Sequence, residues 1–225
     1  QAIGGKRERM IRRTRECLEI LKGASPDRMM NYNGELYKVW GYQPKWYTDT
    51  PPLIYFGSNH PQSRKLSTEL ADGLITSDFV VPLMKDFIDK AHAELKAAGR
   101  SPRDFRISNF WAWHVKADRE AALKEARREL IIRSWLSPHH IGSFMSAEDC
   151  SYIQAHKAAF ITAWRDRSGD IKGVPQRIID ALIEGITTTG DLSEMDRHIA
   201  RLQEFSDAGL DELAASASNA SSLLA

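Results

Sequence analysis

The stretch that decides the fold is residues 52–61, Pro-Leu-Ile-Tyr-Phe-Gly-Ser-Asn-His-Pro. A continuous apolar run at 53–56 lies between prolines and a glycine, which is typical of a short strand buried on both faces of a parallel sheet. Pro61 stands where a helix can begin, because proline is favoured at the first helical position. The stretch therefore predicts a strand, a tight loop at 57–60 and then a helix.

The same alternation continues along the chain. Further strands are predicted at 74–76, 105–115 and 210–214, and amphipathic helices at 6–21, 61–71, 79–98, 117–134 and 191–209. A hairpin with a tight turn at Asn33-Gly34 precedes the first strand, and residues 138–174 read as an irregular helical insertion. Strands that alternate with helices indicate an α/β fold with a parallel sheet and right-handed crossovers. No linker is visible, so residues 1–225 are expected to form a single domain.

Composition excludes several classes of protein. The 225 residues carry 31 Lys+Arg against 30 Asp+Glu, a net charge of +1, which argues against a nucleic-acid binder. The longest apolar run, residues 158–164, has 7 residues, whereas a membrane helix needs about 20. We therefore expect a cytoplasmic protein with no nucleic-acid or membrane partner.

Local details give further expectations about single residues. Cys17 and Cys150 are too far apart to suggest a metal site or a disulfide framework, so both are expected to be buried thiols and no metal is expected. Trp111 and Trp113 alternate on one strand and are expected to pack against a helix rather than line a ligand site. Ser77 and Asp78 are candidate caps of the next helix.

Two other short patterns are given structural interpretations. The pair at 139–140, His-His, is interpreted as surface or interface residues, because no carboxylate triad lies nearby. The sequon at 219–221 is interpreted as coincidental.

Ligands of α/β sheets bind at the carboxyl ends of the strands, so the loop after the first strand is the first candidate site. Gly57 allows close approach of a ligand to the backbone, and Ser58 offers a hydroxyl. The helix that starts near Pro61 presents free N–H groups and a positive dipole end, a combination suited to a phosphate. An ordinary strand-to-helix turn explains the same residues, and both interpretations stay open at this point.

The chain resembles the luciferase-like flavin oxidoreductase superfamily in four passages that occur in the family's order. The first is residues 52–61 followed by Glu-Leu-Ala-Asp-Gly at 69–73 and Leu-Ile-Thr at 74–76. The others are at 15–23 with 32–37, at 98–102, and at 189–194 with 208–213. The closing passage at 174–190 is most similar to the branch that uses the deazaflavin coenzyme F420, including methylenetetrahydromethanopterin reductases.

The resemblance implies a (β/α)8 TIM barrel, of which this chain holds about strands 5–8. It implies hydride transfer between coenzyme F420 and a small organic substrate. Gly57, Ser58, Asn59 and His60 fall on the family's cofactor-phosphate loop, and Thr76 and Ser77 match positions that face the cofactor or substrate. His60 departs from the glycine usual at its position in this branch.

Two alternative functions stay open. An FMN-dependent luciferase-like monooxygenase is favoured by Gly57-Ser58, and a non-catalytic partial-barrel interaction protein by the missing amino-terminal half. The chain begins at Gln1 with only four predicted strands, whereas a TIM barrel has eight in about 250 residues. We expect the first four strands to precede this segment or to come from another chain, so no catalytic residue is assigned. Because barrels of this family often pair, a homodimer is expected, with the aromatic residues of 37–47 as a candidate interface.

Overall fold

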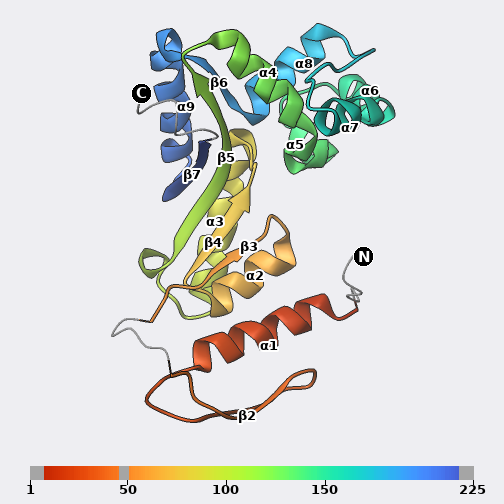
Figure 1. Ribbon diagram of the computed structural model, residues 1–225. Helices are drawn as coiled ribbons and strands as arrows, with labels where there is room; N and C mark the ends of the chain where they lie inside the picture. The colour runs from red at the N-terminus through yellow and green to blue at the C-terminus, as the bar shows by residue number, and fades with distance from the viewer. Residues whose placement is uncertain (1–7, 46–50, 218–225) are drawn as a thin grey trace. The chain divides into compact units, whose positions relative to one another are not determined.

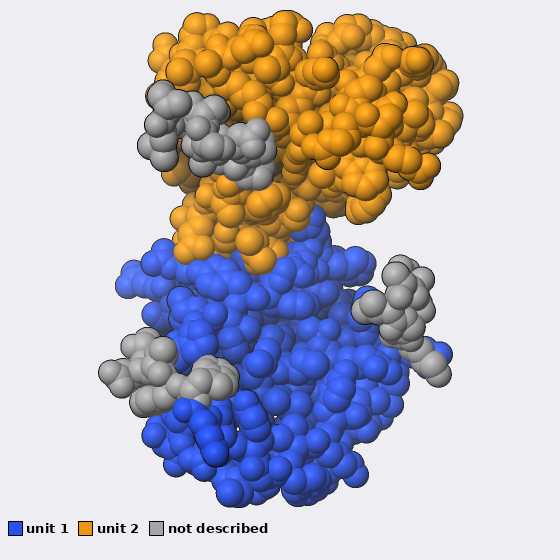
Figure 2. All heavy atoms as spheres, in the orientation of Figure 1, with its two compact units in different colours: residues 1–74, 91–106 blue, residues 75–90, 107–225 orange. Residues whose placement is uncertain are grey.

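The computed structural model describes residues 8–45 and 51–217. The chain divides into two compact units (Figure 2). The first unit is residues 1–74 and 91–106, and the second is residues 75–90 and 107–225. No helix among the described residues has both the length and the apolar character needed to cross a bilayer.

A five-stranded sheet runs through the described residues (Figure 1), with strand order β3-β4-β5-β6 and β7 paired with β5. Its strands are β3 Tyr55–Gly57, β4 Gly73–Ser77, β5 Arg106–Lys116, β6 Thr188–Asp191 and β7 Glu212–Ala217. The four predicted strands are confirmed in number, whereas β6 was missed. The expectation that the first strand is buried on both faces is wrong, because β3 lies at the end of the strand order, with Tyr55 and Phe56 half-buried and Gly57 exposed. The sheet has room for β6 because β5 is 11 residues long, and β7 pairs in parallel with its first part and β6 with its last four residues.

The first unit contains the helix α1 Met10–Gly23, the antiparallel hairpin β1 Met30–Asn33 with β2 Lys38–Tyr42, α2 Pro61–Leu70 and the short turn η1 Pro102–Asp104. The predicted helices at 6–21 and 61–71 are thereby confirmed over the described residues. The amphipathic helix predicted at 6–21 was expected to bury the apolar residues Met10, Ile11, Cys17, Leu18 and Leu21. This is largely wrong, since Leu18 is buried, Ile11 is half-buried and the other three are exposed. Side-chain ion pairs from Arg15 to Glu69 and from Lys22 to Asp72 tie α1 to the segment around α2 instead.

Glu16 is fully buried on α1 and holds the hairpin turn in place. Its carboxylate accepts hydrogen bonds from the backbone N–H groups of Glu35, Leu36 and Tyr37 at 2.8–3.0 Å. A Cβ atom at Gly34 would collide with this carboxylate, so glycine is required there for close approach. Neither Asn33 nor Gly34 has a positive φ, which makes the expected tight Asn-Gly turn wrong. The loop at 34–37 is closed by the Gly34 N–H, which donates to the Tyr37 carbonyl at 2.9 Å, and it is fixed further by the Glu16 carboxylate.

The pKa of Glu16 is set by two opposed effects. Burial raises it, but the N–H groups of Leu36 and Tyr37 and the Arg12 guanidinium outweigh burial and lower the pKa to about 2, from 4.5. A carboxylate with a lowered folded-state pKa stabilises the fold fully above its unfolded pKa. That contribution is lost as the pH falls from 4.5 towards 2.

We predict that Glu16→Gln lowers the urea midpoint of unfolding at pH 7, because a neutral amide cannot accept three backbone hydrogen bonds as strongly as a carboxylate. Between pH 4.5 and 2, the urea midpoint of the variant should also fall less steeply than that of the wild type, because the variant has no carboxylate at residue 16 to be protonated. Urea unfolding across this pH range measures both effects. Glu8→Gln, at an exposed position just before α1, is the matched control, and equal pH profiles for the three proteins would contradict the prediction.

The second unit is built around β5 and the helices that follow it. These are α4 Arg119–Glu129, η2 Leu130–Ile132, η3 Ser134–Leu136, α5 Pro138–Ile141, α6 Ala147–Ala155, α7 Lys157–Arg165, α8 Gln176–Ile186, η4 Leu192–Glu194 and α9 Met195–Asp207. The helices α4 to α8 gather together in Figure 1 around a buried apolar cluster that includes Leu130, Ile153, Phe160 and Leu182. α3 Val81–Ala97 runs through both units.

Most predicted helices of this region are confirmed, with one correction. The helix predicted at 117–134 ends at Glu129, because the chain then makes two short turns, the second with left-handed backbone at Ser134, Trp135 and Leu136. A capping box of Asp191 and Glu194 forms before α9, where the sequence predicted a helix from residue 191.

The tryptophans of β5 pack against a helix, as predicted. The Trp111 ring is fully buried, meets the ring of Phe205 on α9 edge-on at 4.9 Å, and its Nε1–H donates to Thr188 Oγ1 at 2.9 Å. Trp113 lies 5.9 Å from the ring of His198, also on α9.

Two other sequence interpretations need correction. His140 is buried rather than on the surface, with its ring edge-on to Phe79, because α5 turns it into the apolar cluster. Cys150 is buried as expected, whereas Cys17 is exposed on α1. The sequon at 219–221 lies outside the described residues.

Candidate functional site

The loop between β3 and α2 offers a helix amino terminus without a side-chain cap. His60 occupies the N-cap position with extended backbone (φ −94°, ψ 138°), and its side chain makes no capping hydrogen bond. Ser58 Oγ accepts from the His60 N–H at 3.0 Å, which shapes the loop. No acidic residue lies in the first turn of α2. The N–H groups of that turn and the positive end of the helix dipole are therefore available to an anion.

Gly57 and His60 are exposed, and Ser58 and Asn59 are half-buried. The four residues predicted for the phosphate loop thus follow one another at the carboxyl end of β3, as the sequence indicated. A loop of this kind can bind a phosphate through backbone amides, with no positively charged side chain.

Thr76 and Ser77, at the carboxyl end of β4, differ in exposure. The Thr76 side chain is fully buried, and its hydroxyl donates to Asn109 Oδ1 at 2.9 Å. Ser77 is exposed. It does not cap α3, because the helix begins four residues later at Val81. Of the two predicted residues, Ser77 is the one whose side chain a ligand could reach.

Asn109, on the neighbouring strand β5, fixes the loop that follows Ser77. Its Nδ2–H donates to the Phe79 carbonyl at 3.0 Å, and its Oδ1 accepts from the Phe79 N–H at 3.2 Å. The amide therefore pairs with the backbone of Phe79 as a neighbouring strand would. Both residues are buried, so these bonds replace hydrogen bonds that water cannot supply.

Asp78 adds a buried charge at the same strand end. Its backbone is left-handed (φ 51°), and its carboxylate lies 3.2 Å from Arg133 Nη1 and accepts from the Ser134 N–H at 3.3 Å. Burial raises the pKa of Asp78 above its ordinary value, although the Arg133 guanidinium acts to lower it. The expected role of Asp78 as a helix cap is wrong because Arg133 and Ser134 use its carboxylate.

The charged network continues from Arg133 to the carboxyl end of β5. Arg133 also pairs with Glu129, and Glu129 lies 3.8 Å from His114 Nε2. His114 Nδ1 is 3.0 Å from Glu125, which pairs with Lys116 at 2.9 Å. Burial lowers the pKa of His114, although both carboxylates act to raise it. The network therefore joins the last residues of β5 to the loop after β4.

Asn109, Arg133 and His114 were not singled out from the sequence. A signal existed for Asn109, a polar residue within the otherwise aromatic strand at 105–115, where a buried amide needs partners. Arg133 gave no signal because its partner Asp78 is 55 residues away.

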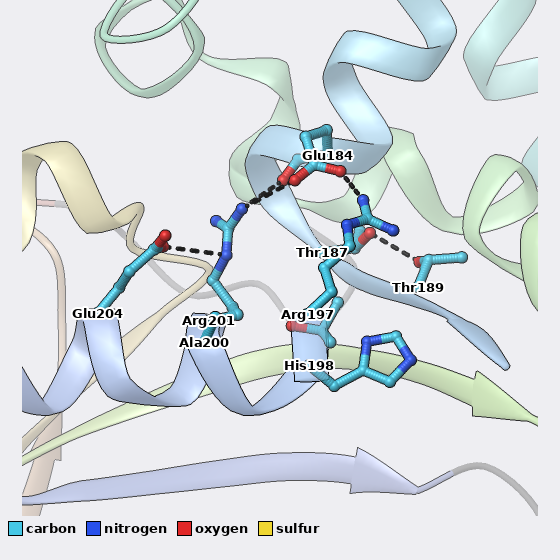
Figure 3. Close-up of a pocket in the computed structure, with 9 residues that line it drawn as sticks. Glu184, Thr187, Thr189, Arg197, His198, Ala200, Arg201 and Glu204 are labelled. Atoms are coloured by element: carbon cyan, nitrogen blue, oxygen red, sulfur yellow. Dashed lines mark hydrogen bonds and ion pairs between the residues drawn. The ribbon is translucent and has the colours of Figure 1, made fainter. Parts of the chain in front are cut away.

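Two hollows lie in the second unit, and neither contains a predicted site residue. The smaller, of about 90 Å³, lies beside Thr187, Thr189 and α9. Figure 3 shows the Glu184 side chain between Arg197 and Arg201, with which it forms ion pairs. Arg197 also pairs with Glu194 and Arg201 with Glu204, so both positive charges there are compensated. The larger, of about 460 Å³, is lined by Val81, Pro82, Phe144, Ala181, Gly185, Glu184, Arg201 and Glu204. Neither combines a helix amino terminus with unpaired positive charge.

We predict that Asn109→Leu lowers the free energy of unfolding by about 2–4 kcal/mol, because the buried N–H and C=O of Phe79 lose their partners. Urea unfolding monitored by tryptophan fluorescence measures the change. Asn59→Leu, on the half-buried loop after β3, is the control for loss of an asparagine and should cost less. Equal losses in the two variants would show that Asn109 has no special structural role.

Comparisons with known proteins place these observations in a family. The sequence profile of the family described as luciferase-like monooxygenase matches residues 1–212. The 5,10-methylenetetrahydromethanopterin reductase of Archaeoglobus fulgidus is 28% identical over 221 residues, which cover 96% of this chain and 63% of that protein.

Two solved structures share the fold. The coenzyme F420-dependent tetrahydromethanopterin reductase of Methanopyrus kandleri matches 89% of this chain and 54% of its own, with a TM-score of 0.66 and 17% identity. An F420-dependent secondary alcohol dehydrogenase, solved with an F420–acetone adduct, matches 88% and 54% with a TM-score of 0.60 and 19% identity. The predicted α/β class, with part of a luciferase-like TIM barrel, is confirmed. The chain spans between half and two thirds of the length of these relatives.

Proposed function

The chain belongs to the luciferase-like monooxygenase family, and from this premise we propose that it acts in a coenzyme F420-dependent oxidoreductase. The reaction is hydride transfer between the deazaflavin and a small organic substrate. The observation that carries the proposal is the uncapped, acid-free amino terminus of α2 at the carboxyl end of β3, which suits a cofactor phosphate. The similarity to an F420-dependent reductase and dehydrogenase supports the choice of cofactor.

Each of the two units contains residues that suit such a cofactor. Gly57, Ser58, Asn59 and His60 would place the phosphate at the amino terminus of α2, where the free N–H groups of the first turn would hold it, and the bond from the His60 N–H to Ser58 Oγ would fix the loop. Ser77 would meet the ring or the substrate with its exposed hydroxyl, and buried Thr76 would position it through the bond to Asn109. When bound, the deazaflavin supplies the hydride chemistry, and the protein contributes orientation and exclusion of water. No residue of the chain is assigned an acid-base role.

An FMN-dependent monooxygenase is the alternative, and Gly57-Ser58 at the phosphate loop favours it. A non-catalytic partial-barrel interaction protein is the second alternative, and it would bind neither cofactor.

The proposal extends to the organisation of the protein. We place residues 1–225 in the second half of a TIM barrel, with 138–174 as an insertion, and infer a homodimer in the cytoplasm. The free thiols Cys17 and Cys150 are in keeping with a reducing compartment. Exposed Trp40 and Tyr42, with half-buried Tyr37, are the described aromatic residues of the proposed dimer interface, while Trp46 and Tyr47 lie outside the described residues.

Titrating the intact protein with oxidised coenzyme F420 and, separately, with FMN tests the choice of cofactor. We predict that F420 binds at least about 10-fold more tightly, a difference of about 1.4 kcal/mol. Tighter binding of FMN, with oxygen consumption in the presence of reduced FMN, would favour the monooxygenase instead. Binding of neither would favour the interaction protein.

The His60→Asp variant tests the phosphate loop. Aspartate at the N-cap accepts hydrogen bonds from the first-turn N–H groups and places negative charge where a phosphate would bind. We predict that the Kd for coenzyme F420 rises about 10-fold or more while the melting temperature stays the same or rises. His60→Ala, which leaves the N–H groups free, should change the Kd by less than about 3-fold. Equal affinity in the wild type and both variants would exclude this loop as the phosphate site.

A further inference from the structure

The segment after α4 has an unusual backbone. Ser134, Trp135 and Leu136 have φ values of 47°, 53° and 49°, and Asp78, to which the segment is bonded, has a φ of 51°. L-residues rarely adopt this left-handed conformation, and runs of such residues are rarer still. Backbone strain of this kind persists only where the surrounding structure fixes it, and it gathers at functional sites.

Several contacts fix the segment from both sides. Arg133, which is 4% exposed, pairs with Asp78 and Glu129. The Ser134 hydroxyl lies 3.2 Å from the Asp78 carbonyl oxygen and 3.4 Å from that of Ser77. Leu136 is fully buried, and its carbonyl accepts from Gln154 Nε2 at 2.7 Å. The turn is therefore fastened to the carboxyl end of β4 at one side and to α6 at the other.

Between these buried anchors, the chain exposes a large aromatic side chain. Trp135 is 62% exposed, although the residues two before and one after it are almost inaccessible to water. Trp135 is exposed on a segment that Ser134 holds to the loop after β4, through contacts with the carbonyl oxygens of Ser77 and Asp78. Ligands of α/β folds bind at the carboxyl ends of the strands, where this loop lies.

We propose that Trp135 contacts the flat ring system of the coenzyme bound at the carboxyl end of β4. The inference rests on the proposed function. Aromatic rings attract one another in offset or edge-to-face arrangements, and a ligand ring would cover an indole face that is now exposed. Arg133 and Ser134 act as positioning residues, because they touch the loop of Ser77 and Asp78 and set the place of the indole.

Coenzyme titrations of Trp135→Ala and Trp135→Phe in the intact protein test this assignment. Trp135→Ala should raise the Kd for oxidised coenzyme F420 about 10-fold, equivalent to about 1.4 kcal/mol, and Trp135→Phe should restore most of the affinity. The wild type should also lose more indole fluorescence on binding than either variant. Trp164→Ala, at an exposed tryptophan of α7 with ordinary helical backbone, is the matched control and should leave the Kd unchanged.

The outcomes separate this inference from the proposed function. If the wild type binds neither F420 nor FMN, the proposed function fails and the inference fails with it. If the wild type binds F420 and all variants bind it equally, the inference alone is wrong. Because Trp135 is exposed, both variants should have the melting temperature of the wild type. If Trp135→Ala does not fold, the Kd of Trp135→Phe decides the question.

Discussion

The paired hydrogen bonds between the Asn109 side chain and the backbone of Phe79 are the interaction on which the second unit depends. They join β5 to the loop after β4 at a place where water has no access, so the loop can adopt only one course. Thr76 donates to the same amide oxygen and adds a third bond. The position of Ser77 and the left-handed conformation of Asp78 follow from this constraint.

The charged groups next to Asn109 are stable only as a complete set. A buried ion pair gains little over apolar packing, but removal of one partner leaves an uncompensated charge. Arg133 lies between Asp78 and Glu129, so each of these three charges has an opposite neighbour, and Glu129 also approaches the His114 ring. Such a network specifies one arrangement of the segment after α4, and this explains how a left-handed turn is maintained.

The first unit solves a similar problem with a different group. Glu16 adds to the hairpin's own hydrogen bond between Gly34 and Tyr37 by accepting from three successive N–H groups. In both units, one buried polar side chain fixes the course of a loop. Loops of this kind are rigid without being apolar, which suits a protein whose ligand contacts are expected on loops.

The sequence by itself determined the order of strands and helices. The short apolar run at 53–56 and the aromatic and β-branched stretch at 105–115 predict strands. Pro61 and Asp191 predict helix starts, because proline suits the first helical position and an aspartate side chain can cap a helix. The sequence also predicted the loop at 57–60, whereas the structure showed that the amino terminus of α2 has no side-chain cap from His60. Only the tertiary structure decided the positions of β6, buried His140 and the Asp78–Arg133 pair, because each depends on partners far along the chain. Strand pairing, burial and charge compensation depend on residues that are neighbours in space, so a local sequence pattern cannot predict them.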